Sequence, residues 1–344
     1  MKSKIKIDIN SQIPLYKQLV RFFQDGVDTG EYKEGDFIPS MNELATELNI
    51  SKETVKKAYS VLRKEEVIEA SQGKGFYITA RNRDKIKILL LFDKISTYKQ
   101  DLFNSFAETI GDRAGITIHL HNQEIDLLEF FINENLDNFD YYIITPHFPL
   151  NPDIQKRVIK ILKKIPNRKL ILVDRFIEGL PGNFGSVYQD FENDIIDGLT
   201  QSIDLLKKYD RLNVISMAGS LYAPLIEKGI KQFCDINKMN INIIRQFNVG
   251  KIQKKDFFLT LNGQVDHDFI KLIKAAQAEG FKIGKDIGVI AYNESPINEI
   301  ILNGLTVFST DFKQMGELTA KMILEKSLRK IRCDFKLIKR NTFN

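Results

Sequence analysis

Long apolar runs are missing from this sequence of 344 residues. No segment approaches the roughly 18 consecutive apolar residues that a membrane-spanning helix needs. No apolar run follows the first basic residues of the chain either, as it would in a secretory signal. We therefore expect a cytoplasmic protein without membrane contact.

Cysteine and net charge are also scarce. Cys234 and Cys333 are isolated and show no metal or redox spacing, which suits a reducing compartment. The net charge is only +5, so bulk charge does not by itself indicate a nucleic-acid partner. The chain has 43% hydrophobic residues, enough for two or three domains with buried cores.

Sequence signatures of enzymes are missing as well. There is no Gly-rich phosphate loop, nucleophile elbow or cluster of metal ligands. His119 and His121 point the same way on a predicted strand, but no third metal ligand accompanies them. We expect no catalytic residues, no metal and no other cofactor. An enzyme that acts on a small polyol stays as an alternative, because carboxylates in the second half of the chain could form an acid and base pair.

Two helices joined by a tight turn are predicted between residues 40 and 64. Ser40 and Glu43 have the spacing of a capping box, and Asn49 can take the left-handed conformation that ends a helix. Ser51 is a second N-cap candidate, and the helix that it begins has an apolar stripe with lysines mostly off that stripe. Such a pair can place its second helix in the major groove of DNA.

A glycine-tipped hairpin is predicted around residues 72–75, with apolar residues on either side. Lys74 at its tip can reach a phosphate or a minor groove. Helices and hairpin together predict an α+β winged helix-turn-helix domain over residues 1–79. The predicted DNA-binding residues are Ser40, Asn42, Ser51, Lys52, Thr54, Lys56, Lys57, Gly73 and Lys74.

This part of the chain resembles the GntR-type winged helix-turn-helix regulators. Four segments carry the resemblance in the order of the family: residues 14–19, 35–40, 51–55 and 72–75. The sequence departs from the family pattern at two positions. Asn42 stands where the family usually has an arginine, and Glu66 stands where it usually has a glycine.

The pattern changes after a short polar stretch, residues 80–85, which we interpret as a linker. From residue 86 to 344, short apolar runs alternate with helical patterns, which is typical of parallel sheets covered on both faces. The segment is too long for one such sheet of ordinary size. We therefore predict a two-lobed α/β domain with a ligand cleft at the carboxyl ends of its strands.

Polar residues follow several of these predicted strands. Together with nearby aromatic rings, they offer hydrogen-bond partners for hydroxyl groups and flat faces for C–H groups, which is what a sugar needs. An Asp or Asn at a strand end can instead cap the next helix. The predicted sugar-binding residues are Asp93, Tyr98, His147, Asp174, Arg175, Tyr222, Asn262, Asn293, Glu294 and Asp311.

The segment after the linker resembles the effector domain of LacI-type repressors and sugar-binding periplasmic proteins. The resemblance rests on residues 172–175, 190–191, 279–293, 305–307 and 315–316. It implies that Asp174, Asn262 and Asn293 lie near sugar-contacting positions, that Arg175 lines the cleft, and that two copies dimerise side by side through this domain. Ile226 stands where we expect the arginine that is common in the family.

A GntR-type head with a sugar-binding body resembles arabinose- or fucose-responsive regulators. The implied function is transcription regulation of a sugar-utilisation operon. Fucose or a pentose such as arabinose would bind between the lobes and alter the affinity of a homodimer for double-stranded operator DNA. A sensor of a non-sugar metabolite is the other alternative.

Overall fold

The computed structural model describes residues 5, 7–9, 11, 13–72, 74–79, 85–216, 219–247, 252–261 and 267–344. The chain divides into two compact units, which we call the head (residues 1–85) and the body (residues 86–344). The predicted linker, except for Lys85, lies outside the described residues.

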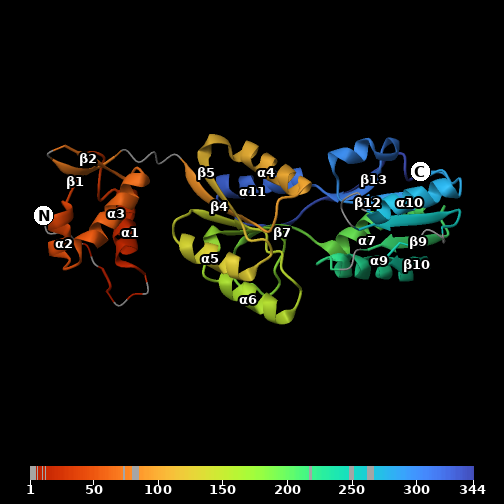
Figure 1. Ribbon diagram of the computed structural model, residues 1–344, viewed down its shortest axis with the longest axis horizontal. Coiled ribbons are helices and arrows are strands. Elements are labelled where there is room, and N and C mark those ends of the chain that lie inside the picture. Colours follow the sequence, from red (N-terminus) through yellow and green to blue (C-terminus); the bar gives the residue numbers. More distant parts are fainter. Residues whose placement is uncertain are drawn as a thin grey trace. The chain divides into compact units, whose positions relative to one another are not determined.

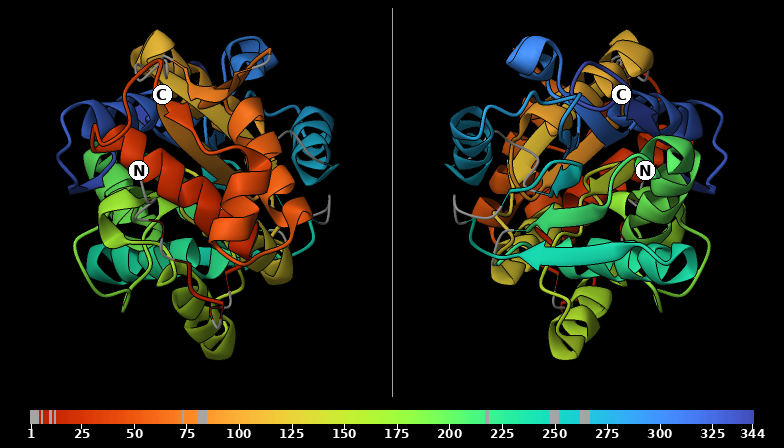
Figure 2. Two further views of the ribbon diagram at one scale, coloured as in Figure 1. Left: turned by 90° about the vertical axis from the view of Figure 1, so that its left-hand side faces the viewer. Right: turned by 90° about the vertical axis from the view of Figure 1, so that its right-hand side faces the viewer.

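In its described residues, the head combines three helices with a small antiparallel sheet (Figure 1; Figure 2, left). The helices are α1 (Leu15–Asp28), α2 (Met41–Glu47) and α3 (Lys52–Lys64). The strands β1 (Phe37–Ile38), β2 (Ile68–Ser71) and β3 (Gly75–Ile78) pair in the order β1-β3-β2. This is a winged helix-turn-helix, so the predicted fold of the first domain is confirmed.

The ends of the head's helices follow from a few side chains. Ser40 and Glu43 form a complete capping box, in which the Ser40 hydroxyl accepts from the Glu43 N–H and the Glu43 carboxylate accepts from the Ser40 N–H. Asn49 has a φ of 53°, which turns the chain between α2 and α3. Leu44 and Leu62 are fully buried in the core under this turn.

Glu66 also takes the left-handed conformation, with a φ of 56°. It lies two residues after the end of α3 and begins the path into β2. A glycine adopts this conformation without a steric penalty, whereas an L-residue with a Cβ atom is strained there. The backbone therefore has the shape that the usual glycine of the family would favour, although the side chain is a glutamate.

The described part of the body forms two six-stranded sheets, one in each lobe (Figure 1). The first sheet is parallel throughout, with the order β14-β8-β7-β6-β4-β5. Its strands are β4 (Ile86–Phe92), β5 (Ala114–Leu120), β6 (Tyr141–Ile144), β7 (Leu170–Arg175), β8 (Gly185–Gln189) and β14 (Lys330–Arg332).

The second sheet has the order β10-β9-β11-β12-β13-β15, and only its edge pair β13–β15 is antiparallel. Its strands are β9 (Arg211–Ile215), β10 (Asn240–Ile244), β11 (Asp256–Thr260), β12 (Gly288–Tyr292), β13 (Thr306–Thr310) and β15 (Phe335–Ile338).

Helices cover both faces of each sheet. In the first lobe, α4 (Thr97–Ile110) and α11 (Phe312–Leu324) pack on one face, while α5 (Ile125–Asn135) and α6 (Pro152–Leu162) pack on the other. In the second lobe, α7 (Phe191–Gln201) and α9 (Ala223–Asn237) cover one face and α10 (His267–Ala278) covers the other, as the right view of Figure 2 allows the reader to follow. The predicted two-lobed α/β architecture with parallel sheets is confirmed.

The chain passes between the lobes three times. The first connection joins β8 to α7, the second joins β13 to α11, and the third joins β14 to β15. The last long helix, α11, therefore belongs to the first lobe, where Gly316 lies against the backbone of α4. These connections bring residues that are far apart in sequence to the boundary between the lobes.

Candidate functional site

The amino end of α3 is fixed by its own first turn. The Ser51 hydroxyl accepts a hydrogen bond from the Thr54 N–H at 3.1 Å and lies 2.8 Å from the Thr54 hydroxyl. Ser51 and Thr54 thus supply hydrogen-bond partners for each other and set the direction of the helix. Lys52, the first residue of α3, is exposed beside them.

The other predicted DNA contacts of α3 have different surroundings. Lys56 is exposed and lies 3.5 Å from the Glu53 carboxylate. The Lys57 ammonium lies 4.1 Å from the centre of the Tyr16 ring on α1, in a cation–π contact inside the head. Lys57 therefore has a packing partner that the sequence did not indicate.

The remaining predicted contacts of the head lie on α2 and at the wing. Ser40 is the N-cap of α2, and Asn42 is exposed on its first turn. Lys74 is exposed between β2 and β3. Gly73 lies outside the described residues.

A cavity of about 400 Å³ lies between the two lobes of the body. Most of its polar lining comes from the carboxyl ends of β4, β6, β7, β8 and β12. Ligands of open parallel sheets bind at this edge, where several strand ends converge. Six of the predicted sugar-binding residues line the cavity: Asp93, Tyr98, His147, Asp174, Tyr222 and Asn293.

A buried lysine holds the carboxylates of this cavity in place. Lys99 is only 1% exposed; its ammonium contacts the Asp93 carboxylate and lies 3.8 Å from the Asp174 carboxylate. The same Asp174 oxygen lies 2.9 Å from His147 Nε2. The Thr145 hydroxyl donates to Asp93 at 2.9 Å.

The protonation states follow from burial and from these contacts. Burial lowers the pKa of His147 from 6.5 to about 4, against the pull of Asp174. Burial also lowers the pKa of Lys99 from 10.5 to about 8, again with Asp174 opposing the change. Burial alone would raise the pKa of Asp174, but His147, Lys99 and the Gln189 amide together lower it. At neutral pH the cavity is thus lined by carboxylates and a neutral imidazole, with the Lys99 ammonium buried behind them.

Aromatic rings form part of the opposite wall. Tyr222 stacks on Phe191 with ring centres 4.4 Å apart, and its edge meets His147 across the lobes at 4.9 Å. Tyr292 is 3% exposed, and burial raises the pKa of its hydroxyl well above 10, so this hydroxyl stays a hydrogen-bond donor.

Several buried polar atoms at the cavity lack a hydrogen-bond partner among the described residues. They include Asp93 Oδ2, the Tyr292 hydroxyl and Asn293 Oδ1. Buried polar groups are almost always paired with protein, water or ligand, so these atoms mark positions where a bound molecule would complete the hydrogen bonding.

Two of the lining residues have strained backbones. Asp174 has a φ of 72° although it lies within β7, and Asn293 directly after β12 has a φ of 70°. Asp and Asn tolerate this region better than most residues, and such conformations concentrate at ligand sites. This backbone conformation sets the direction of the Asp174 and Asn293 side chains at the ends of their strands.

Arg175 does not line the cavity. Its guanidinium donates to the carbonyl oxygens of Pro146 and Phe148 at 3.1 and 3.2 Å and to the Gln155 amide oxygen at 2.9 Å. It also lies 5.6 Å from the centre of the Tyr222 ring. Arg175 therefore fixes the segment that carries His147, and its predicted contact with a sugar stays a prediction.

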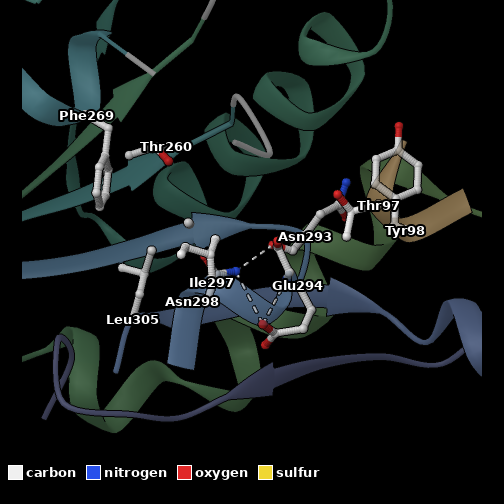
Figure 3. Close-up of a pocket in the computed structure, with 11 residues that line it drawn as sticks. Thr97, Tyr98, Thr260, Phe269, Asn293, Glu294, Ile297, Asn298 and Leu305 are labelled. Carbon is white, nitrogen blue, oxygen red and sulfur yellow. Dashed lines mark hydrogen bonds between the residues drawn. The ribbon is translucent and has the colours of Figure 1, made fainter. Parts of the chain in front are cut away.

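Two other predicted sugar contacts have structural roles outside the cavity. Glu294 pairs with Arg340 at 2.8 Å and accepts from the Ser295 N–H, and Figure 3 shows it beside Asn298 in a second pocket of about 100 Å³. Asp311 caps α11 and pairs with Lys336 at 2.9 Å. Asn262 lies outside the described residues.

Two residues that bind the carboxylates of this site were not among the predicted ones. Lys99 lies on the buried stripe of α4 with Leu102 and Phe106, so a lysine within an apolar helical period was an available signal. Gln189 ends β8, lines the cavity and donates to the Asp174 carboxylate. Nothing in the local sequence marked it, because β8 itself was not predicted.

The two histidines of β5 and its end have packing roles. His119 stacks on Phe131 with ring centres 4.6 Å apart, and His121 stacks on Phe148 at 4.8 Å. Among the described residues, no group of three or more His, Cys, Asp or Glu side chains is placed to hold a metal ion. No helix in the described part of the chain is long and apolar enough to cross a membrane.

Comparisons with known families match both units. Residues 15–78 match the family described as "Bacterial regulatory proteins, gntR family", and residues 261–332 match the "Periplasmic binding protein-like domain". The resemblances noted for the head and for the body are thereby confirmed at the level of these families.

Individual proteins agree with these matches. The chain is 36% identical over 98 residues to the HTH-type transcriptional repressor YtrA of Bacillus subtilis. The aligned segment covers 28% of this chain and 72% of YtrA. It is 25% identical over 181 residues to the HTH-type transcriptional regulator TreR of the same organism. That aligned segment covers 50% of this chain and 69% of TreR. Both are named as regulators, and the expectation that the chain is not an enzyme is confirmed.

Among solved structures, the dimeric Lac repressor with an 11-residue C-terminal deletion is similar in fold. The TM-score is 0.58 at 15% identity, and the match covers 75% of this chain and 98% of that chain.

Proposed function

Because this chain belongs to the GntR family of bacterial regulatory proteins, we propose that it is a homodimeric, sugar-responsive transcription regulator. Its head binds the double-stranded operator of a sugar-utilisation operon, and its body binds a monosaccharide. The observation that carries the sugar assignment is the cavity of about 400 Å³, with carboxylates, amides and aromatic rings at the carboxyl ends of the strands.

The lining suits a ligand with several hydroxyl groups. Asp93 and Asp174 accept hydrogen bonds from hydroxyls, and the unpaired Asn293 oxygen and Tyr292 hydroxyl add further partners. The stacked pair of Phe191 and Tyr222 offers apolar ring surface for the C–H groups of a sugar. Hydroxyls and C–H faces occur together in a pyranose or furanose.

The charge of the lining favours a sugar without phosphate. The carboxylates of Asp93 and Asp174 line the cavity, and the buried Lys99 near both of them is already engaged. Lys94 also lines the cavity, but it is an exposed residue whose charge is screened by water. A phosphate would meet these carboxylates at short range, whereas a neutral sugar donates to them.

Within the neutral sugars we place fucose and pentoses such as arabinose first. Ile226 and Leu261 line the cavity as apolar contacts, which suit C–H groups or the methyl group of a deoxyhexose. A pocket of this kind separates a methyl from a hydroxymethyl group by only about 1 to 3 kcal/mol, so related sugars would bind with graded affinities.

In the DNA-bound state, α3 enters the major groove. Lys52, Thr54 and Lys56 lie near base edges or phosphates, and Lys74 of the wing contacts a phosphate or a minor groove. Two bodies dimerise side by side, so two heads bind two half-sites. Sugar binding closes the lobes and changes operator affinity about 5 to 150-fold, which corresponds to a coupling free energy of about 1 to 3 kcal/mol.

A thermal-shift screen of the purified full chain tests the sugar assignment. The compounds are pentoses, deoxyhexoses, hexoses and their phosphates. A ligand at a hundred times its dissociation constant adds about 2.7 kcal/mol to the stability of the protein that binds it. We expect a shift with arabinose or fucose and none with the corresponding phosphates.

The Asp174→Asn variant serves as the matched control, because the amide keeps the size of the side chain and removes the negative charge. It should lose the sugar-dependent shift and keep operator binding. A shift with sugar phosphates alone would contradict the neutral-sugar assignment, and a wild-type protein that responds to no sugar would contradict the proposed function.

A further inference from the structure

A hydrogen-bonded chain leads from the cavity to two of the three connections between the lobes. Gln189 ends β8 at the first connection, and Thr310 ends β13 at the second. The Thr310 hydroxyl donates to the Gln189 amide oxygen at 2.8 Å. These residues are 121 positions apart in the sequence, so the bond joins the two connections directly.

The other end of the Gln189 amide reaches the cavity. Its Nε2 donates to the Asp174 carboxylate, the group that we place against the sugar. Asp174, Gln189 and Thr310 are 0%, 5% and 3% exposed, so bulk water does not compete for these bonds. Hydrogen bonds in such surroundings are stronger and more costly to break than at the surface.

The Gln189 amide can take only one orientation in this series of hydrogen bonds. Asp174 is ionised and has no hydrogen to donate, so it needs the NH₂ side of Gln189. The amide oxygen is then left for the Thr310 hydroxyl, which acts as the donor. Any movement of the Asp174 carboxylate toward a ligand therefore pulls on Gln189, and through it on the second connection.

We propose that Gln189 is a positioning residue that transmits sugar binding from Asp174 to the connection at Thr310. Closure of two lobes requires rotation within their connecting segments, and these segments are where Gln189 and Thr310 lie. A ligand hydroxyl that shares the Asp174 carboxylate changes the bond to Gln189 and shifts the balance between open and closed lobes. The inference rests on the proposed function of the cavity.

The Thr310→Val variant tests this role, because Thr310 does not line the cavity and valine has nearly the same shape. Two quantities are measured in the full chain: the affinity for sugar without DNA, by calorimetry, and the affinity for an operator selected from random duplexes, with and without saturating sugar. Arabinose is the first probe, followed by any other sugar that shifts the wild-type protein.

We expect Thr310→Val to leave sugar affinity nearly unchanged and to reduce the sugar-dependent change in operator affinity about 2- to 12-fold, the range that one buried hydrogen bond gives. In Gln189→Glu, a carboxylate oxygen replaces the NH₂ group that donates to Asp174. This variant should lose more of the sugar-dependent change in operator affinity.

Thr319→Val is the matched control. Thr319 is 1% exposed, and its hydroxyl donates to the Met315 carbonyl within α11 at 2.7 Å, away from the cavity. It should keep the coupling of the wild-type protein. Full coupling in Thr310→Val, or an equal loss in Thr319→Val, would overturn the role of Gln189. Absence of coupling in the wild-type protein would instead contradict the proposed function itself.

Discussion

Acid should destabilise the body through buried histidines, and His121 allows this effect to be isolated. His121 is 0% exposed and stacks on Phe148, and its Nε2 lies 3.0 Å from the Thr145 carbonyl oxygen. Burial lowers the pKa of His121 from 6.5 to about 4, with Lys99 and His147 acting in the same direction. We predict that the His121→Phe variant, which keeps a stacking ring, is less sensitive to acid than the wild-type protein.

The sign follows from proton binding. The folded-state pKa lies below that of the unfolded chain, so the unfolded chain binds more protons between pH 6.5 and about 4. The contribution of His121 to stability is therefore intact above pH 6.5 and is lost as the pH falls through this window. A change from 6.5 to about 4 corresponds to about 3 kcal/mol.

Two other buried groups titrate in the same range. His147 acts in the same direction as His121, because its pKa is also lowered to about 4. Asp194 acts in the opposite direction, since burial raises its pKa to about 6 against the pull of Arg332. Both groups are present in wild type and variant, so the comparison of the two proteins removes their contributions.

Urea unfolding of wild type and His121→Phe at several pH values between 7 and 4 measures the difference. At pH 7 the variant should be about 1 kcal/mol less stable, because the bond to Thr145 is lost. The variant should then lose about 3 kcal/mol less than the wild type on acidification. Two parallel curves would refute the assignment of His121 as a buried, neutral imidazole.

Three further changes test other parts of the structure. Glu66→Gly should stabilise the head by about 0.5 to 1 kcal/mol in urea unfolding, because the relief of left-handed strain exceeds the entropic cost of glycine, while Glu66→Ala should give no gain. Lys52→Ala should weaken operator binding in an anisotropy titration and reduce the dependence of log affinity on log salt concentration by about one. Lys57→Ala loses the contact with Tyr16, so it should lower the stability of the head more than it changes this salt dependence. Gly316→Ala should destabilise the body by about 1 to 3 kcal/mol or more, because its Cβ would clash with the Leu102 carbonyl oxygen. The same change at Gly115, which has open space around it, should cost far less.

Most of the fold could be predicted from local sequence patterns. The capping box at Ser40 and the left-handed Asn49 fix the helices of the head within a few residues, because their effects depend only on near neighbours. The long apolar strands of the body were predictable for the same reason. The strands β14 and β15 were not, because they are short and their partners are distant in sequence. The strand β8 pairs with the preceding β7, but its sequence Gly-Ser-Val-Tyr-Gln contains no apolar run that would have marked it.

The site was harder to predict than the fold. Residues directly after strands, such as Asp93 and Asn293, reach the cavity because parallel strands end at one edge. Asp311 follows a strand equally directly, yet it lies where the chain crosses to the other lobe and caps a helix there. Lys99 escaped notice because its role depends on two carboxylates that only the folded sheet brings near it.

The most direct test of this account is the operator affinity of the full chain, measured by fluorescence anisotropy while arabinose or fucose is titrated to saturation. Calorimetry on the same samples establishes that the cavity is occupied. We predict a change in operator affinity of about 5 to 150-fold in the wild-type protein and none in Asp174→Asn. An occupied cavity with unchanged operator affinity would contradict the account.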